Sequence, residues 1–221
     1  MKWNKSCYIV GAGDFAAELF QPTSNDLILC ADGGFNHLQE LPYAIDYFVG
    51  DNDSIACVPP EGVVKYEYPS EKDSTDMSLA LDLGYSLGCR SFHLFGACGD
   101  RIDHFYANMQ LMSRFAKSGC QIRLVDERFS LYCVHCGRIS SSQSDKGKTI
   151  SVFTPDAQAQ GVSIQGLKYA LQNETLRCTF PLGVSNESMG MGFEIRVTDG
   201  TLLVFSYDHK ANQHIQITNS H

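Results

Sequence analysis

The chain has 221 residues, of which 43% are hydrophobic and 19% are charged, a composition typical of a folded protein with a buried core that argues against disorder. Its 25 acidic and 17 basic side chains give a net charge of -8, which excludes a broad nucleic-acid-binding surface but leaves room for a small polyanion held with Mg²⁺ or a few basic side chains. The length favours two modest domains over one large domain.

Short apolar runs alternate with helical stretches in roughly the first 125 residues, as in a parallel sheet with helices on its faces. The buried-looking runs are residues 7–10, 27–31, 47–49, 92–95 and 122–125. Ligands of such sheets bind beyond the carboxyl ends of the strands. We therefore expect functional side chains directly after these runs.

Two helices are predicted in this half. The first follows Thr75, with Ser74 or Thr75 as its cap, and its apolar spacing predicts a buried face of Met77, Ala80, Leu81, Gly84 and Leu87. The second follows Asp100. Its predicted buried stripe is Ile102, Phe105, Met109, Met112 and Ala116, which leaves Asp100, His104 and Asn108 on another face.

From about residue 140 the pattern changes to period two, which is typical of strands with one buried face. Such segments cover residues 149–153, 161–167, 175–180, 193–197 and 202–207, and Asp199-Gly200 predicts a hairpin turn between the last two. The serine-rich residues 140–147 resemble a linker. The predicted fold class is thus α/β, with an N-terminal parallel-sheet α/β domain over residues 1–139 and a C-terminal antiparallel β-sandwich over residues 140–221.

The nine cysteines are scattered through predicted strands and helices, which favours reduced, mostly buried thiols over a disulfide framework. Cys133 and Cys136 have the spacing of a zinc knuckle or a redox motif. A second ligand pair is missing and the surroundings are those of a strand, so packing is the favoured interpretation. Since no apolar run approaches the roughly 20 residues that span a bilayer, we expect a cytoplasmic protein without membrane association.

Three acidic pairs follow predicted strands in the first half: Asp51 with Asp53, Asp73 with Asp76, and Asp100 with Asp103. Any one pair is readily explained as a turn or a helix cap. Three pairs at one edge of a sheet, each beside Gly, Lys or Arg, instead indicate oxygen ligands for Mg²⁺ and its phosphates. Glycine-rich turns, Gly11-Ala12-Gly13 and Ala31-Asp32-Gly33-Gly34, also follow strands, where they permit close approach to the backbone.

The ordered set of motifs resembles the thiamine pyrophosphokinase family over nearly the whole chain. The resemblance rests on Ala31-Asp32-Gly33-Gly34 with Asn36, Gly50-Asp51-x-Asp53-Ser54, Lys72-Asp73-x-Thr75-Asp76, Gly96-Ala97-x-Gly99-x-Arg101-x-Asp103-His104 with Asn108, and Gly183-x-Ser185-Asn186-Glu187. Each motif is short, but five in this order make coincidence improbable.

This resemblance implies an enzyme that transfers pyrophosphate from ATP to the hydroxyl of thiamine, giving thiamine diphosphate and AMP. It implies a homodimer with an active site shared between subunits, the α/β domain binding ATP and Mg²⁺ and the β-sandwich completing the thiamine site. The residues expected to form the catalytic Mg²⁺ site are Asp51, Asp53, Asp73 and Asp76. Those expected at the nucleotide are Asp32, Gly33, Asn36, Lys72, Thr75, Arg101, Asp103 and His104, and those expected at thiamine are Ser185 and Asn186.

Two other functions fit part of the sequence. Asp51-Asn52-Asp53-Ser54-Ile55 resembles the nucleophile loop of haloacid dehalogenase-type phosphatases, although that loop usually follows the first strand and here follows the third. A non-catalytic sensor of thiamine or nucleotide is the other alternative. The acidic pairs argue against a sensor, because a protein that only binds a polyanion has no need of carboxylates around it. The general base of the transfer stays unassigned, with Asp73, Asp76 and His104 as candidates.

Overall fold

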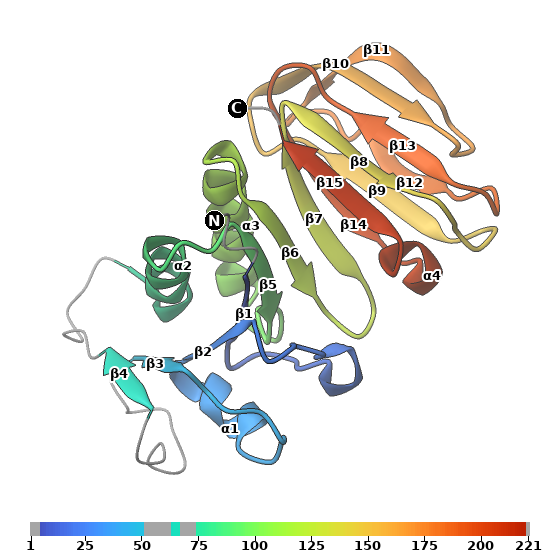
Figure 1. Cartoon of the computed structure of the whole chain (residues 1–221). Coiled ribbons are helices and arrows are strands. Elements are labelled where there is room, and N and C mark those ends of the chain that lie inside the picture. The colour runs from blue at the N-terminus through green and yellow to red at the C-terminus, as the bar shows by residue number, and fades with distance from the viewer. Residues whose placement is uncertain (1–4, 51–62, 67–73, 220–221) are drawn as a thin grey trace. The chain divides into compact units, whose positions relative to one another are not determined.

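A computed structural model of the chain describes residues 5–50, 63–66 and 74–219 (Figure 1). Two compact units divide it: Met1–Asn108 with Leu124–Glu127, and Met109–Arg123 with Arg128–His221. The division runs through helix α3 (Ile102–Lys117) and strand β6 (Gln121–Val125), so both of these elements contribute to both units.

The first unit is built on a parallel sheet. Its strands are β1 (Ser6–Val10), β2 (Leu27–Ala31), β3 (Tyr47–Val49), β4 (Val64–Tyr66) and β5 (Ser91–Phe95), and they lie in the order β5-β1-β2-β3-β4. Each neighbouring pair is parallel, with Tyr8 opposite both Ile28 and His93. The carboxyl ends of β1, β2 and β5 therefore meet at one edge of the sheet.

Helices pack on both faces of this sheet. Successive residues of β1 point to opposite faces, so neighbouring residues contact different helices. Tyr8 and Val10 belong to one buried cluster with Phe35 and Leu38 of α1 (Phe35–Leu38), which follows a short 3₁₀ helix (Asp32–Gly34). Cys7, on the other face, lies against α2 (Asp76–Ser86), where a Cβ on Gly84 would approach the Cys7 sulfur to 2.8 Å. A second 3₁₀ helix, Ala17–Leu19, lies in the connection from β1 to β2.

The two predicted helices are confirmed as α2 and α3, but the predicted buried faces need correction at their ends. Leu87 is 41% exposed because it lies just beyond the last residue of α2. Ile102 is 70% exposed because it is the first residue of α3. Asn108, expected on a polar face, is buried.

Among the described residues, no helix is long and apolar enough to cross a bilayer.

The second unit contains two antiparallel arrays. One has the order β12-β9-β14-β7 and the other the order β11-β10-β13-β8-β15. The short helix α4 (His209–Asn212) precedes β15. The bounds of these strands are β7 Ser130–His135, β8 Gly137–Ser141, β9 Thr149–Phe153, β10 Gln158–Gln165, β11 Leu171–Arg177, β12 Gly183–Glu187, β13 Phe193–Arg196, β14 Thr201–Ser206 and β15 Ile215–Asn219.

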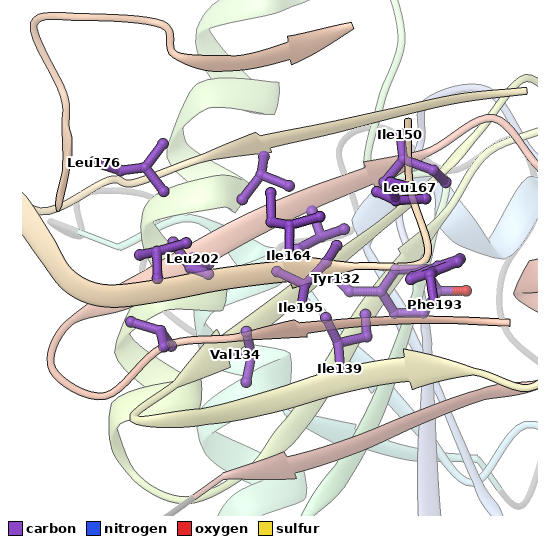
Figure 2. Close-up of a cluster of buried hydrophobic side chains, with 14 of the residues drawn as sticks. Tyr132, Val134, Ile139, Ile150, Ile164, Leu167, Leu176, Phe193, Ile195 and Leu202 are labelled. Atoms are coloured by element: carbon purple, nitrogen blue, oxygen red, sulfur yellow. The ribbon is translucent and has the colours of Figure 1, made fainter. Parts of the chain in front are cut away.

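A single hydrophobic core joins the two arrays (Figure 2). Alternate residues of β7 and β14, such as Tyr132, Val134 and Leu202, meet Ile139 and Ile195 from the opposing array. Alternation of this kind is the mark of a sandwich, in which the inner faces of two sheets interdigitate. The structure confirms the predicted fold class, a parallel α/β part followed by an antiparallel sandwich.

The segment around Asp199-Gly200 differs from its prediction. Gly200 has the expected positive φ of 103°, but the strands on either side do not form a hairpin. β13 pairs with β8 and β10, whereas β14 pairs with β7 and β9. This turn therefore carries the chain from one sheet to the other. Within the serine-rich residues 140–147, Ser141 ends β8 and both Ser141 and Ser144 are buried, so the segment lies inside the second unit.

Candidate active site

Two glycine-containing loops lie side by side where β1 and β5 end. Backbone hydrogen bonds run from Gly11 N to Phe95 O (2.8 Å), from Gly13 N to Gly96 O (2.8 Å) and from Asp14 N to Cys98 O (2.6 Å). The pairing of β1 with β5 thus continues past the strands, into residues 11–14 and 96–99. This hydrogen-bonded extension, called the floor below, lies at the carboxyl edge of the sheet, the edge at which ligands of such folds bind.

Glycine is required in this floor because the two backbones nearly touch. Gly96 has a φ of 56°, and a Cβ there would run into the carbonyl oxygen of Gly11. A Cβ on Gly11 would lie 2.7 Å from the Gly96 oxygen. The glycines therefore bring loop against loop, which a larger residue would force apart.

The turn after β2 lies against the same edge. A Cβ on Gly34 would meet the carbonyl oxygen of Val10 and lie 3.1 Å from the Gly11 Cα. Asp32 has a φ of 47°, a left-handed conformation that Asp tolerates better than most residues. Its Cα would lie 3.1 Å from a Cβ on Gly50, the residue that follows β3. Asp32 thus lies close to Gly50, Gly33 is buried in the 3₁₀ helix, and Asn36 lies partly buried in α1.

Helix α2 begins at this edge as well. The Met77 Cε atom would lie 3.1 Å from a Cβ on Gly11, which places the first turn of α2 beside the end of β1. Thr75 is the N-cap, and its hydroxyl accepts a hydrogen bond from Ser78 N at 3.2 Å, as predicted. Asp76 is partly buried in the first turn. Its carboxylate therefore lies at the positive end of the helix, where negative charge is stabilised.

The start of α3 carries a two-pronged ion pair. Arg101 Nε donates to Asp103 Oδ1 at 2.9 Å, and Arg101 Nη2 donates to Asp103 Oδ2 at 2.7 Å. These hydrogen bonds hold the pKa of Asp103 well below its usual range and raise the pKa of Arg101. Both side chains are exposed, so the pair contributes little to stability and the guanidinium can exchange partners. His104 is exposed beside them.

The side chains of Asn108 and His37 each contact a backbone carbonyl of the floor. The buried Asn108 side chain donates from Nδ2 to the Ala97 carbonyl at 2.8 Å, which ties α3 to the loop of residues 96–99. His37 Nε2 lies 2.9 Å from the Gly13 carbonyl, and its ring stacks on Phe15 at 5.0 Å. The sequence motifs include Asn108 but not His37. The position of His37, three residues after the glycine-rich turn that ends at Gly34, is the feature of the sequence that could have identified it.

Ser185 and Asn186 lie on β12 in the second unit. Ser185 has a φ of 56°, is exposed, and donates from its backbone N–H to the Ser151 hydroxyl at 3.0 Å. The Asn186 side chain is 4% exposed. Its Oδ1 accepts from Tyr169 N and Glu187 N, both at 2.9 Å, and its Nδ2 donates to Tyr169 O at 2.7 Å. Asn186 thus fixes the backbone of a residue 17 positions away.

Tyr169 is the functional candidate that the sequence motifs missed. The residue is 59% exposed, although its backbone N–H and C=O are both bonded to Asn186. Lys168 Nζ lies 5.6 Å from the ring centre and also pairs with Glu187 Oε2 at 2.9 Å. An aromatic face and a carboxylate beside it are groups that attract an organic cation.

Four predicted site residues, Asp51, Asp53, Lys72 and Asp73, fall outside the described residues. Asp76 is therefore the member of the proposed Mg²⁺ set whose place is known. Within the described parts of the chain, no group of three or more His, Cys, Asp or Glu side chains could hold a metal ion.

Two family models match the chain. Residues 22–124 match the catalytic domain of thiamin pyrophosphokinase, and residues 137–202 match its vitamin B1 binding domain. The thiamine pyrophosphokinase of Bacillus subtilis is 30% identical over 143 residues, which cover 62% of this chain and 67% of that protein.

Solved structures give the same relationship. The crystal structure of the Bacillus subtilis thiamine pyrophosphokinase has a TM-score of 0.78 and 25% identity, covering 91% of this chain and 98% of that one. The structure of the thiamin pyrophosphokinase of Geobacillus thermodenitrificans has a TM-score of 0.78 and 25% identity, and the match covers 91% of this chain and 96% of that one. The thiamin pyrophosphokinase of Candida albicans, at 17% identity and a TM-score of 0.75, covers 92% of this chain and 89% of its own, and shows the shared fold.

Proposed function

The chain belongs to the thiamine pyrophosphokinase family, and we propose that it transfers the terminal pyrophosphate of ATP to the hydroxyl of thiamine. The observation that carries this function is the match of two family domain models, one for catalysis and one for vitamin B1, to successive parts of a single chain. The alternatives, a phosphatase and a silent sensor, have no support from these relatives.

In this proposal the thiamine oxygen attacks the β-phosphorus of ATP, and the bond from that phosphorus to the α-phosphate oxygen breaks to release AMP. The chemistry needs alignment and charge neutralisation more than a covalent protein intermediate. The floor of residues 11–14 and 96–99, the start of α2 and the Arg101 guanidinium are the described features suited to phosphates. A planar guanidinium can grip two phosphate oxygens.

We propose Mg²⁺ as the metal and Asp51, Asp53, Asp73 and Asp76 as its holders. The partly buried Asp76 carboxylate, in the first turn of α2, has the hard oxygen atoms that this ion prefers. The ion would neutralise charge on the transferred phosphates. Asp32, Gly33, Asn36, Lys72, Thr75, Asp103 and His104 complete the proposed nucleotide site.

For thiamine we propose Ser185 and Asn186, with distinct contributions. The Ser185 side chain is exposed and can contact a ligand, whereas the Asn186 amide already bonds to protein backbone. Asn186 therefore acts as a positioning residue that presents the Tyr169 ring. The thiazolium ring of thiamine is a cation, and it would take the place of the Lys168 ammonium, which lies beside the Tyr169 ring and pairs with Glu187.

We also propose a cytoplasmic homodimer in which each active site uses residues 1–139 of one subunit and residues 140–221 of its partner. Refolding equal amounts of Asp76→Ala and Asn186→Ala chains together makes about half of the dimers mixed, each with one intact site. With thiamine well below its KM, these sites should add roughly a quarter of wild-type activity to the low activity of the Asn186→Ala homodimers. Mixing without subunit exchange should add nothing to the activity of the separate homodimers. Verified exchange without recovery of activity would show that both residues serve the same subunit's site.

The direct test of the function is incubation of the protein with ATP, Mg²⁺ and thiamine. Equal amounts of AMP and thiamine diphosphate are expected. A phosphatase would instead release inorganic phosphate and form a phosphoaspartate that can be trapped.

A further inference from the structure

The turn between β7 and β8 holds a cysteine beside a histidine. Cys136 is partly exposed, and its φ of 43° is a left-handed conformation that is uncommon outside glycine, Asn and Asp. Strained backbone of this kind often accompanies a functional site. Cys133, three residues earlier, is fully buried in β7, and this burial raises the pKa of its thiol. The two cysteines therefore lie in different environments: the Cys133 thiol is packed in the core, and Cys136 is partly exposed.

The imidazole of His135 faces the Cys136 thiol. Cys136 Sγ lies 3.5 Å from His135 Nε2, within hydrogen-bond reach for sulfur. The other ring nitrogen, Nδ1, lies 3.0 Å from the hydroxyl oxygen of Thr201, the residue directly opposite His135 in the antiparallel pairing of β7 with β14. When Nδ1–H donates to Thr201 Oγ1, Nε2 can accept the thiol proton, and it lies nearer to Sγ than the Gly200 carbonyl oxygen, which is 3.9 Å away.

Thr201 is well placed to orient the ring because it is itself fixed. It is fully buried, and its backbone N–H donates to Asp156 Oδ2 at 2.9 Å. The backbone N–H of Cys136 donates to Gly200 O at 3.0 Å, and that of His135 donates to Asn219 Oδ1 at 3.0 Å. Nucleophile, base and orienting group thus form one chain of contacts, the arrangement that activates nucleophiles in enzymes.

We propose that Cys136 is a reactive thiol that His135 activates, and that it forms mixed disulfides with low-molecular-weight disulfides. His135 Nε2 takes the thiol proton, and the Cys136 sulfur attacks one sulfur of the reagent. The S–S bond of the reagent breaks, a bond from Cys136 to that sulfur forms, and the other half leaves as a thiolate that is then protonated. This site is independent of the nucleotide and thiamine residues of the proposed function.

The chain offers an internal control in Cys178, which is exposed, whereas Cys136 is only partly so. Exposure alone predicts that Cys178 reacts faster, and activation by His135 predicts the opposite. The full-length protein is treated with glutathione disulfide at fixed pH, the reaction is stopped by alkylation, and each cysteine peptide is quantified by mass spectrometry. We expect the mixed disulfide to form at least about tenfold faster on Cys136 than on Cys178, since a thiolate is the attacking species.

His135→Asn should bring the rate at Cys136 down to or below that of Cys178 and leave the rate at Cys178 unchanged. Thr201→Val, which keeps the buried volume and removes the hydroxyl, should lower the Cys136 rate in the same direction. Equal or faster reaction of Cys178 in the wild-type protein overturns the proposal, whatever the variants do. So does a Cys136 rate that stays high in a folded His135→Asn protein.

Discussion

The side-chain amide of Asn186 holds the backbone of Tyr169 at both its N–H and its C=O, at 2.9 and 2.7 Å. One buried side chain therefore substitutes for a pair of strand hydrogen bonds and fixes the backbone that carries an exposed ring. In the proposed function, Asn186 would therefore act on thiamine through Tyr169 and not by direct contact.

Replacing Asn186 with Ala should leave the partly buried backbone groups of Tyr169 without their amide partner, at a cost of up to roughly 1 kcal/mol each. The melting temperature should fall, and the KM for thiamine should rise about tenfold, which corresponds to about 1.4 kcal/mol. The KM for ATP should change less. Tyr169→Phe keeps both the ring and the backbone hydrogen bonds, so it should behave nearly as wild type. An unchanged thiamine KM in a folded Asn186→Ala protein would remove Asn186 from the substrate site.

Asp76→Asn should lower turnover by more than about 100-fold, the scale seen when a group that stabilises transition-state charge is lost. The swap removes charge with little change in volume, so the melting temperature should change little. Asp82→Asn is the matched control, because Asp82 is exposed on the same helix. If the two variants have equal activity at saturating Mg²⁺, Asp76 serves only to begin the helix.

Arg101→Lys should raise the KM for ATP or slow the transfer, since an ammonium acts as a point charge where a guanidinium grips two oxygens. Steady-state kinetics with varied ATP measure this. Arg114→Lys, in the last turn of the same helix, is the comparison and should leave both constants near wild type. Identical kinetics for the two variants would mean that Arg101 only pairs with Asp103.

Asp156 gives the stability of the second unit a dependence on pH. Burial acts to raise its pKa, but hydrogen bonds from Lys117 Nζ (2.6 Å) and Thr201 N (2.9 Å) prevail and lower it. A carboxyl with a lowered folded pKa stabilises the fold fully above its unfolded pKa of about 3.9, and this contribution is lost as the pH falls below that value.

The variant Asp156→Asn should therefore be less stable at pH 7 and should lose less stability than wild type between roughly pH 4 and pH 2. Urea unfolding across this range measures the difference. Glu194→Gln, which breaks an exposed pair with Arg138, should follow the wild-type curve closely. Parallel curves for wild type and Asp156→Asn would show that the ion pair adds no stability.

Much of the fold could be predicted because buried strands and amphipathic helices leave periodic patterns. Residues 27–31, 47–49 and 149–153 coincide with β2, β3 and β9. The Asp199-Gly200 turn shows the limit. A positive φ is a local property that a Gly in the sequence predicts. The sheet that the next strand joins depends instead on partners that are distant in the sequence.

The site shows the same limit. The sequence offered Ser74 or Thr75 as a cap, and the structure selects Thr75. The motifs included Asn186 as a candidate site residue, but they did not predict the hydrogen bonds between Asn186 and Tyr169. Glycine-rich turns suggested close approach of a ligand, and the structure reveals that Gly11 and Gly96 first bring two loops together. Helical periodicity put Asn108 on a polar face because it takes no account of the Ala97 carbonyl that this amide satisfies.

The fate of each phosphate of ATP tests the central claim most directly. In separate reactions with Mg²⁺ and thiamine, ATP labelled at the α- or the β-phosphorus is supplied and the products are separated. Pyrophosphoryl transfer predicts that the α label appears only in AMP and the β label only in thiamine diphosphate. A β label that stays in ADP, or that is released as inorganic phosphate while thiamine is unchanged, would contradict the account.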